Sequence, residues 1–543
     1  MTDREITVKI FKDPVADPIE RKIRAGVTIE ELLGEYRSHL PYRIITARVN
    51  GDDVPLSFVL KKDCGIIFCD IRDNTANRSF QRGLTFLYLK AVYDLHGKAA
   101  KVFIRNSVNR GIFSTLEIPE GNSENEKPRE RPRDEDLRQI EKRMWQLVDA
   151  NLPIESKSGD IYSLDGYKNS FYGIMPPSTG YIHTFALEAM RYGVLLRFPH
   201  PSDPGKLAVY KRDARIFDAY DAEQAFLDEL QLAQISDLNK QIEAGPMSIG
   251  NIIAAAESRH LSRINDIAQR VADTKKRVVL IAGPSCSGKT TFSKRLIQSL
   301  EGHCGSQPLY LGTDDYFLDR EYAPRDKRGD YNFEGLDAMD VDLFIQNIEE
   351  LLEGKTADIP AFDFIEGKKV FGTRKTKLKK NQVVVVEGIH ALNKKMTLGI
   401  EDEVKFKIYI SPLTQLNIDD HNRVPSTDVR LIRRMIRDNR TRGRSVVDTL
   451  QQWPKVRAGE SVNIFPYNNE ADEVFNTTLI YELPVMKKHI EPLLKEIKPG
   501  EAAYGYAKWL LHFLSFFTQI EDESAIPIES ILREFIGGSC YGH

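Results

Sequence analysis

The chain has 543 residues, of which 29% are charged and 41% apolar, and its net charge is −3. The length predicts about three or four domains, and the near balance of charge excludes a generally basic nucleic-acid binder and an acidic tail. The five cysteines are scattered without paired C-x-x-C spacing, which excludes a disulfide framework or zinc knuckle and favours a reducing compartment.

Hydrophobicity along the chain bears on its location. The first five residues carry no apolar signal segment, and no stretch approaches the ~18 apolar residues of a membrane span. The apolar run at Trp509–Phe517 is too short to span and is expected to pack in a core. We therefore expect a cytoplasmic protein that makes no membrane contact.

The first 72 residues predict a small α+β domain. Apolar residues alternate from Ile6 to Phe11, a short helix is expected at residues 29–33, and strands are expected near residues 47–49 and 66–68.

A second unit is predicted over residues 73–245. It begins with a long helix around residues 84–92 and resumes helical periodicity at Leu137. Between these helices, residues 121–133 are almost free of apolar side chains and predict a solvated linker. A helical connector over 246–274 then leads to the next domain.

Apolar strands alternate with helices over residues 275–485, which predicts an α/β domain with a doubly wound parallel sheet. Its clearest strands are expected at residues 278–282, 309–311, 383–386 and 406–410. Residues 486–543 predict terminal helices. No internal repeat is found.

The segment Gly283–Thr290 reads GPSCSGKT and fits the pattern G-x-x-x-x-G-K-[ST]. It follows an expected buried strand and precedes an expected helix, an order that a chance glycine-rich turn does not explain. Backbone N–H groups of such a loop bind the α- and β-phosphates of a nucleoside triphosphate, Lys289 reaches the β- and γ-phosphates, and the Thr290 hydroxyl binds Mg²⁺. The loop therefore predicts binding of ATP and Mg²⁺, with contacts from Gly283, Ser285, Ser287, Gly288, Lys289, Thr290 and Thr291.

Two carboxylate positions follow predicted strands, where ligands collect in open α/β sheets. Asp314 and Asp315 end the strand at 309–311, and a carboxylate there can accept a proton from a substrate hydroxyl or hold Mg²⁺; helix capping is the structural alternative. Glu387 precedes Gly388 at the end of the strand at 383–386 and is a candidate metal ligand.

Six arginines form the densest cationic run of the chain. The planar guanidinium group of arginine can bind triphosphate oxygens through two N–H groups at once. The segment Arg442-Gly443-Arg444 resembles a hinged lid. A solvated basic helix and nucleic-acid binding are the alternatives, and the overall charge argues against the second. The run comprises Arg433, Arg434, Arg437, Arg440, Arg442 and Arg444.

Taken in order, five motifs resemble the uridine/cytidine kinase and phosphoribulokinase family over roughly residues 275–480. They are Thr313–Phe317, Asn332–Glu334, Pro360–Phe364, Val386–Ile389 and Arg433–Arg444. The resemblance implies a P-loop kinase in which Asp314 is the base for a ribose 5′-hydroxyl, and Thr290, Asp314 and Glu387 hold Mg²⁺. It also implies that Arg434 contacts substrate and phosphate, that Arg437, Arg442 and Arg444 bind phosphate or form a lid, and that Gln452 helps to read the pyrimidine.

The chain departs from the family at the nucleoside pocket. The ribose-binding aspartate of the family aligns with Glu334, and its pyrimidine-reading tyrosine and histidine align with Phe362 and Gly367. Phe362 and Gly367 side chains cannot form the same hydrogen bonds. We therefore expect the pocket to accept a wider set of nucleosides than a dedicated pyrimidine kinase.

The front half also carries a resemblance. Residues 5–70 resemble the ubiquitin-like (β-grasp) TGS domain, and residues 75–240 resemble the second additional domain of threonyl-tRNA synthetase, through Leu137–Leu147 and Pro177–Tyr181. The H-x-x-x-H pair of that synthetase is replaced by Arg78-Ser79-Phe80-Gln81-Arg82, and no cysteine lies between Cys69 and Cys286. Proofreading of tRNA by zinc chemistry is therefore not expected. His183 is a candidate leftover ligand, and a surface or packed histidine is the favoured alternative.

These observations predict an ATP- and Mg²⁺-dependent kinase of uridine or cytidine, with Asp314, Lys289 and Arg434 as catalytic residues. The substrate is expected to contact Asp314, Glu334, Phe362, Arg434 and Gln452. A kinase of another nucleoside or small alcohol is the second reading, and an ATP-switched RNA-binding regulator is the third. RNA or a small-molecule effector at the front half and a homo-oligomer remain open partners.

Overall fold

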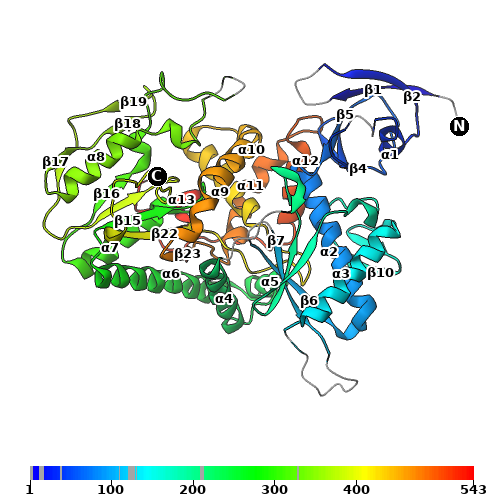
Figure 1. Ribbon diagram of the computed structural model, residues 1–543, viewed down its shortest axis with the longest axis horizontal. Helices are drawn as coiled ribbons and strands as arrows, with labels where there is room; N and C mark the ends of the chain where they lie inside the picture. Colours follow the sequence, from blue (N-terminus) through cyan, green and yellow to red (C-terminus); the bar gives the residue numbers. More distant parts are fainter. Residues whose placement is uncertain are drawn as a thin grey trace.

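The computed structural model describes residues 4–11, 17–36, 40–108, 111–119, 129, 131–207, 213–326, 329 and 331–542. Most of the linker predicted over 121–133 lies outside them. Figure 1 shows a phosphate-loop sheet at one end of the molecule, the first sheet and helices α2 and α3 at the other, and helices α9 to α12 between them. None of the helices in the described segments combines the length and apolarity needed to cross a bilayer.

The N-terminal unit is a five-stranded sheet of order β2-β1-β5-β3-β4. Strands β1 and β5 are parallel, and the other neighbouring pairs are antiparallel. A capping box of Thr28 and Glu31 starts helix α1 (Ile29–Leu33), whose apolar side chains share a core with the sheet. The strands are β1 (Glu5–Phe11), β2 (Ile19–Arg24), β3 (Ile44–Val49), β4 (Asp52–Pro55) and β5 (Cys64–Asp70).

The second unit packs two helices on an antiparallel sheet of order β11-β12-β7-β6. Helix α2 (Asn74–His96) begins at Asp73, whose carboxylate accepts from the N–H groups of Thr75 and Ala76. It is buried over most of its length and shares a core with helix α3 (Asp134–Asp149). The strands of the unit are β6 (Lys101–Val108), β7 (Gly111–Glu117), β8 (Ile154–Ser158), β9 (Ile161–Leu164), β10 (Tyr167–Ser170), β11 (Ala186–Met190), β12 (Gly193–Arg197), β13 (Pro199–His200) and β14 (Asp203–Leu207).

Three helices lead to the next domain: α4 (Ala214–Glu229), α5 (Ile235–Glu243) and α6 (Pro246–Thr274). The last is a single 29-residue helix over the predicted connector, and in Figure 1 it runs beneath the phosphate-loop sheet.

The predicted α/β domain is confirmed as a parallel sheet of order β16-β21-β15-β22-β23. Strand β15 (Val278–Ala282) is central and fully buried. Its side chains alternate between two cores: Val279 and Ile281 face α6 and α7 (Lys289–Cys304), whereas Leu280 packs with α8 (Val341–Leu352). The other strands are β16 (Leu309–Gly312), β21 (Val384–Glu387), β22 (Lys405–Ser411) and β23 (Glu473–Asn476). Four short strands form two antiparallel pairs, β17 (Thr356–Asp358) with β20 (Lys375–Lys377) and β18 (Ala361–Asp363) with β19 (Lys368–Val370).

The last part of the chain is helical and returns to the phosphate loop. Helices α9 (Ser426–Arg442), α10 (Val446–Asn463), α11 (Glu482–Lys495) and α12 (Tyr504–Leu514) build one apolar core. The short helix α13 (Arg533–Ile536) then lies against α9 and the start of α7, near the C-terminus in Figure 1. The five cysteines are free thiols.

Candidate functional site

The phosphate loop joins the carboxyl end of β15 to the N-terminus of α7. Cys286 and Gly288 have left-handed φ angles of 58° and 86°, which turn the backbone sharply between β15 and α7. A Cβ atom at Gly283 would lie 2.1 Å from the carbonyl oxygen of Ile410, so this position admits only glycine. Lys289 folds over the loop and donates to the carbonyl oxygens of Gly283 and Pro284, each at 3.1 Å.

Asp314 and Glu387 lie at the carboxyl ends of neighbouring strands, β16 and β21, which pair so that Gly312 is opposite Glu387. Glu387 accepts hydrogen bonds from the Tyr310 hydroxyl at 3.0 Å and the Thr290 hydroxyl at 3.3 Å. Burial raises the pKa of Glu387 to about 7, against the opposing charge of Lys289. The strand register thus brings two predicted carboxylates to the predicted phosphate loop.

The adjacent aspartates have different surroundings. Asp314 keeps contact with solvent, but loss of part of its hydration raises its pKa, while the positive charges of Lys289 and Arg442 lower it. Asp315 instead pairs with Arg374 at 2.6 Å and accepts from the N–H of Phe362 at 3.3 Å. Asp314 therefore belongs to the site, and Asp315 holds the β18 strand beside it.

Helix α9 carries the arginines of the site around one buried carboxylate, Asp438. Arg434, Arg437 and Arg442 lie 3.3, 2.7 and 3.6 Å from its oxygens. Arg434 also donates to the Ser285 hydroxyl at 2.9 Å, which ties the helix to the phosphate loop. Because one carboxylate faces three guanidinium groups, positive charge remains available to an anion.

The other members of the cationic run have structural contacts or lie at the surface. Arg433 is fully buried, donates to Glu482 at 2.7 Å and reaches the carbonyl oxygen of Thr477 at 2.9 Å. Arg440 donates to the carbonyl oxygens of Glu534 and Phe535. Arg444 is exposed and donates to Gln452, also exposed, at 2.8 Å. This pair lies just beyond the glycine that ends α9.

Two further predicted substrate contacts, Glu334 and Phe362, lie near these residues. Glu334 is half-buried, and burial raises its pKa. The positive charges of Arg434 and Lys289 lower this pKa, and the negative charge of Asp314 raises it. Phe362 packs against Phe317 and Phe364 with ring centroids 5.9 and 5.1 Å apart. A carboxylate therefore lies near Lys289, and an aromatic cluster lies beside Asp315.

Sequence reasoning missed two carboxylates that touch the phosphate loop. Glu460 of α10 is fully buried, accepts from the N–H of Ser285 at 3.0 Å and pairs with Arg430. Glu534 of α13 accepts from the N–H and hydroxyl of Thr291 at 3.2 and 2.7 Å. Neither lies in a motif, and each is more than 170 residues along the chain from Ser285 or Thr291, the residue it contacts at the phosphate loop.

The oxygen donors at the loop fit Mg²⁺. The hydroxyl of Thr290 and the carboxylate of Glu387 are 3.3 Å apart, near the spacing of adjacent oxygens around an ion bound at about 2.0–2.1 Å. The described residues contain no group of three His, Cys, Asp or Glu side chains that could hold a metal alone. These residues therefore fit an ion that shares its coordination with phosphate oxygens and water.

His183, the candidate zinc ligand of the front half, is exposed, and its Nδ1 lies 3.1 Å from the carbonyl oxygen of Tyr181. Arg78 and Arg82, which stand at the expected place of the histidine pair, contact Asp428 and the carbonyl oxygen of Ile174.

Comparisons with known proteins match the part of the chain that contains this site. Residues 278–480 match the Phosphoribulokinase / Uridine kinase family. Uridine kinases of Staphylococcus aureus strains JH9 and Newman are 32% identical over 179 residues, which is 33% of this chain and 76% of each relative. Among solved structures, one titled a possible uridine kinase from Bacillus stearothermophilus aligns with a TM-score of 0.28 at 18% identity, over 40% of this chain and 98% of that one. A D-glycerate 3-kinase from Cryptococcus neoformans var. grubii aligns with a TM-score of 0.21 at 14% identity, over 46% of this chain and 87% of that one.

Proposed function

The chain belongs to the phosphoribulokinase/uridine kinase family, and we propose that it is an ATP-dependent kinase that phosphorylates the 5′-hydroxyl of uridine or cytidine. The observation that carries this proposal is the convergence of Lys289, Asp314 and Arg434 on one phosphate loop. Phosphoryl transfer needs these elements: a triphosphate cradle, a proton acceptor and positive charge over the migrating group.

In the proposed reaction, the loop and Lys289 hold the triphosphate. Asp314 accepts the proton of the substrate hydroxyl, and its raised pKa suits this role because a carboxylate that has lost part of its hydration binds a proton more readily. Arg434 and its neighbours on α9 stabilise the charge that develops on the transferred phosphoryl group. When bound, Mg²⁺ on Thr290 and Glu387, with Asp314 beside them, neutralises charge on the phosphate oxygens.

The nucleoside is placed between Glu334 and the aromatic wall at Phe362. Glu334 is the candidate for the ribose hydroxyls, and Phe362 offers a ring face for the base. Because a ring face attracts every base, the proposed pocket selects pyrimidines weakly. Gln452 accepts a hydrogen bond from Arg444 at the surface. Contact with the base therefore requires that the segment after α9 close over the proposed nucleoside pocket.

We also propose a division of the chain into five parts. Residues 1–72 form a TGS-like β-grasp domain, which the order and directions of the first sheet support. Residues 73–245 form a unit like the second additional domain of threonyl-tRNA synthetase, residues 246–274 a connector, 275–485 the kinase domain and 486–543 the C-terminal helices.

The decisive experiment measures Mg²⁺-dependent ADP release from ATP with uridine, cytidine, adenosine, ribulose 5-phosphate or no acceptor. Lys289→Ala, which removes the charge expected at the β- and γ-phosphates, is the blank. Faster ADP release with uridine or cytidine supports the proposal. Faster release with another acceptor would show that this acceptor is the substrate, and the proposed mechanism of phosphoryl transfer would still apply. If ATP binds but no acceptor speeds ADP release, the kinase proposal is refuted and an RNA-binding regulator is favoured. A filter assay of RNA binding at stated salt then tests that alternative.

A further inference from the structure

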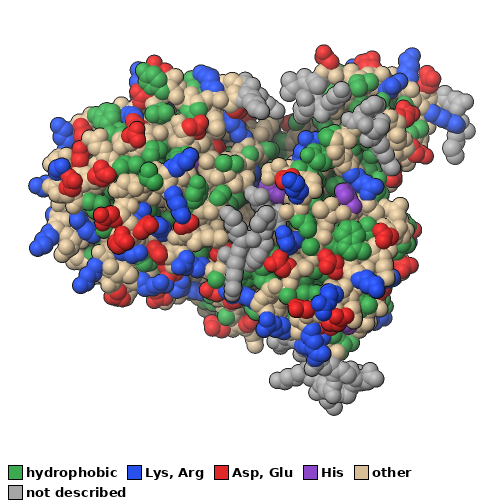
Figure 2. Space-filling view, viewed as in Figure 1, with side chains coloured by type: hydrophobic (Ala, Val, Ile, Leu, Met, Phe, Trp, Pro, Cys, Tyr) green, Lys and Arg blue, Asp and Glu red, His purple; other side chains and the backbone are tan. Residues whose placement is uncertain are grey.

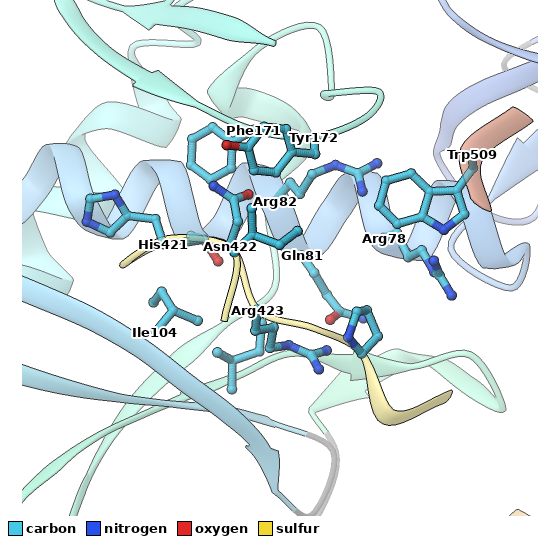
Figure 3. Close-up of a pocket in the computed structure, with 14 residues that line it drawn as sticks. Arg78, Gln81, Arg82, Ile104, Phe171, Tyr172, His421, Asn422, Arg423 and Trp509 are labelled. Atoms are coloured by element: carbon cyan, nitrogen blue, oxygen red, sulfur yellow. The ribbon is translucent and has the colours of Figure 1, made fainter. Parts of the chain in front are cut away.

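A cavity of about 90 Å³ lies between the front half and the kinase domain, away from the phosphate loop. Its lining comes from α2, from the segment after β10, from the loop that leads into α9, and from α12 (Figure 3). Since roughly 10–15 Å³ by this measure holds one water, the space accepts a group several times larger than water.

The lining is cationic. It contains Arg78, Arg82 and Arg423, and its other described residues include no aspartate or glutamate. Arg78 and Arg82 are four residues apart on α2 and therefore share one face of the helix. In Figure 3 they approach the cavity from that helix, while Arg423 approaches from the loop before α9.

One of the three guanidinium groups is already neutralised. Arg78 donates to Asp428 at 2.8 Å and to the Tyr506 hydroxyl at 3.1 Å. Although burial lowers the pKa of Arg78, the charge of Asp428 raises it above its ordinary value. Arg78 is thus held in a fixed position beside the cavity by Asp428, which also accepts from the Tyr506 hydroxyl and the Trp509 indole N–H.

Neither of the other two guanidinium groups forms a hydrogen bond or ion pair with an acid among the described residues, although the charge of Asp428 also attracts Arg423. Arg82 donates only to the carbonyl oxygen of Ile174, from Nε at 3.1 Å and Nη2 at 2.7 Å. Arg423 is half-buried and has no hydrogen bond or ion pair to any residue that the structure describes. Burial lowers the pKa of Arg82 to about 10 and also lowers that of Arg423, with Arg78 contributing to both shifts.

The nearby acids attract these charges only from a distance, because each is bonded to other groups, Asp428 to Arg78. Asp419 accepts from the Tyr172 hydroxyl at 3.0 Å and from the N–H groups of His421 and Asn422. Asp160, which attracts Arg82 weakly, lies 3.1 Å from His512. His421 itself is held by Asn169, and burial lowers its pKa.

Partly buried positive charge that is not paired with an acid is unfavourable, so an anion that enters the cavity gains from both guanidinium groups. Arginine forks present paired N–H donors that match phosphate oxygens. Phe171, Tyr172 and Trp509 add apolar surface to the same lining. We propose that this cavity is a second phosphate site, which binds the phosphoryl group of a small phosphate ester between Arg82 and Arg423.

The site lies where the two halves of the chain meet. Asn422 donates to the carbonyl oxygen of Ser170 at 2.9 Å, and Ile104 donates to that of Asp420 at 2.7 Å. Arg423 is three residues before α9, the helix that carries Arg434 and Arg437. A ligand held by Arg82 and Arg423 therefore bridges the front half to the helix of the phosphate-binding arginines.

The test measures binding of inorganic phosphate and glycerol 3-phosphate to the full chain by calorimetry at constant ionic strength. A Lys289→Ala background weakens phosphate binding at the nucleotide loop, so the result does not depend on the proposed kinase activity. Arg82→Gln and Arg423→Gln are expected to weaken binding at least ~10-fold each, and Arg138→Gln, an exposed arginine on α3, is expected to leave it unchanged. Arg423→Gln removes no contact to a described residue, so its fold should survive even if Arg82→Gln destabilises the chain.

Tighter binding of glycerol 3-phosphate than of phosphate identifies an ester as the ligand, and equal binding identifies free phosphate; both support the site. The proposal is overturned if neither binds, if both arginine variants bind as well as the background, or if chloride and citrate compete equally with phosphate. Binding of a 12-nucleotide RNA without binding of either small phosphate also overturns it.

Discussion

Glu534 accepts hydrogen bonds from the backbone N–H and the hydroxyl of Thr291, at 3.2 and 2.7 Å, in the first turn of α7. This turn follows the phosphate loop, where N–H groups and the helix dipole favour an anion. The same segment places Ile531 so close to Gly288 that a Cβ there would lie 2.5 Å from its Cγ2. The segment from Ile531 to Glu534 therefore occupies donors and space that the proposed nucleotide would also use.

Replacing Glu534 by Gln is expected to tighten ATP binding about 3- to 10-fold. The amide oxygen can still accept from Thr291, but the negative charge near the phosphates is removed. Titration calorimetry with the Lys289-containing protein measures the change in Kd. Glu529→Gln, an exposed neighbour in the same segment, is the control, and unchanged or weaker ATP binding by Glu534→Gln would contradict the expectation.

Replacing Asp314 by Asn is expected to lower kcat at least ~10²-fold, because the amide cannot accept the hydroxyl proton. Asp315→Asn is the matched control, since Asp315 pairs with Arg374 rather than with the site, and its kcat should fall less than ~10-fold. Steady-state rates with uridine and ATP measure both. An unchanged rate in Asp314→Asn would assign Asp314 to metal binding or structure.

The aromatic wall at Phe362 is expected to limit base selection. The ratio of kcat/KM for uridine over adenosine should stay below ~10⁴, because a ring face offers no hydrogen bond for a base edge. Phe362→Tyr is expected to raise this ratio up to ~10-fold, since a hydroxyl then becomes available. A ratio above ~10⁴ in the unaltered protein would refute the broad pocket.

His260 makes the stability of the fold depend on pH. It is buried on α6, with Nε2 3.2 Å from the carbonyl oxygen of Thr478, and burial with the charges of Arg295 and Arg259 lowers its pKa to about 3. Because the unfolded chain takes up this proton near pH 6.5, the free energy of unfolding should fall by up to ~1.4 kcal/mol per pH unit below pH 6.5 and level off near pH 3.

Urea denaturation between pH 7 and pH 4 measures this effect. His260→Gln keeps a donor for Thr478 but cannot titrate, so its stability should fall less steeply with pH. His303→Gln, which alters an exposed histidine, should follow the unaltered protein. Parallel curves for His260→Gln and the unaltered protein would exclude His260 as the cause.

The distribution of charge on the visible surface agrees with the nearly balanced charge of the sequence. Figure 2 shows lysine and arginine interspersed with aspartate and glutamate over the visible face, as expected for a chain with a net charge of −3. Such a face offers a polyanion little net attraction, so the cationic character of the proposed second phosphate site is a property of one cavity and not of the whole molecule.

The sequence by itself determined the phosphate loop, the strands around it and the carboxylates at their ends. These features are local: a buried apolar strand, a glycine-rich turn and a helix start are encoded within about a dozen consecutive residues. The positions of Asp314 and Glu387 followed because parallel strands end at the same edge of a sheet.

Only the tertiary structure decided which of two adjacent aspartates faces the phosphate loop, and which of six arginines are structural. It also decided that Glu460 and Glu534 touch the loop and that Arg82 and Arg423 meet in one cavity. These pairs are between 175 and 341 residues apart in the chain, and no local pattern encodes their meeting. Their contacts depend on how α2, α9, α10 and the end of the chain pack together, because the burial of apolar surface that drives this packing has no direction of its own.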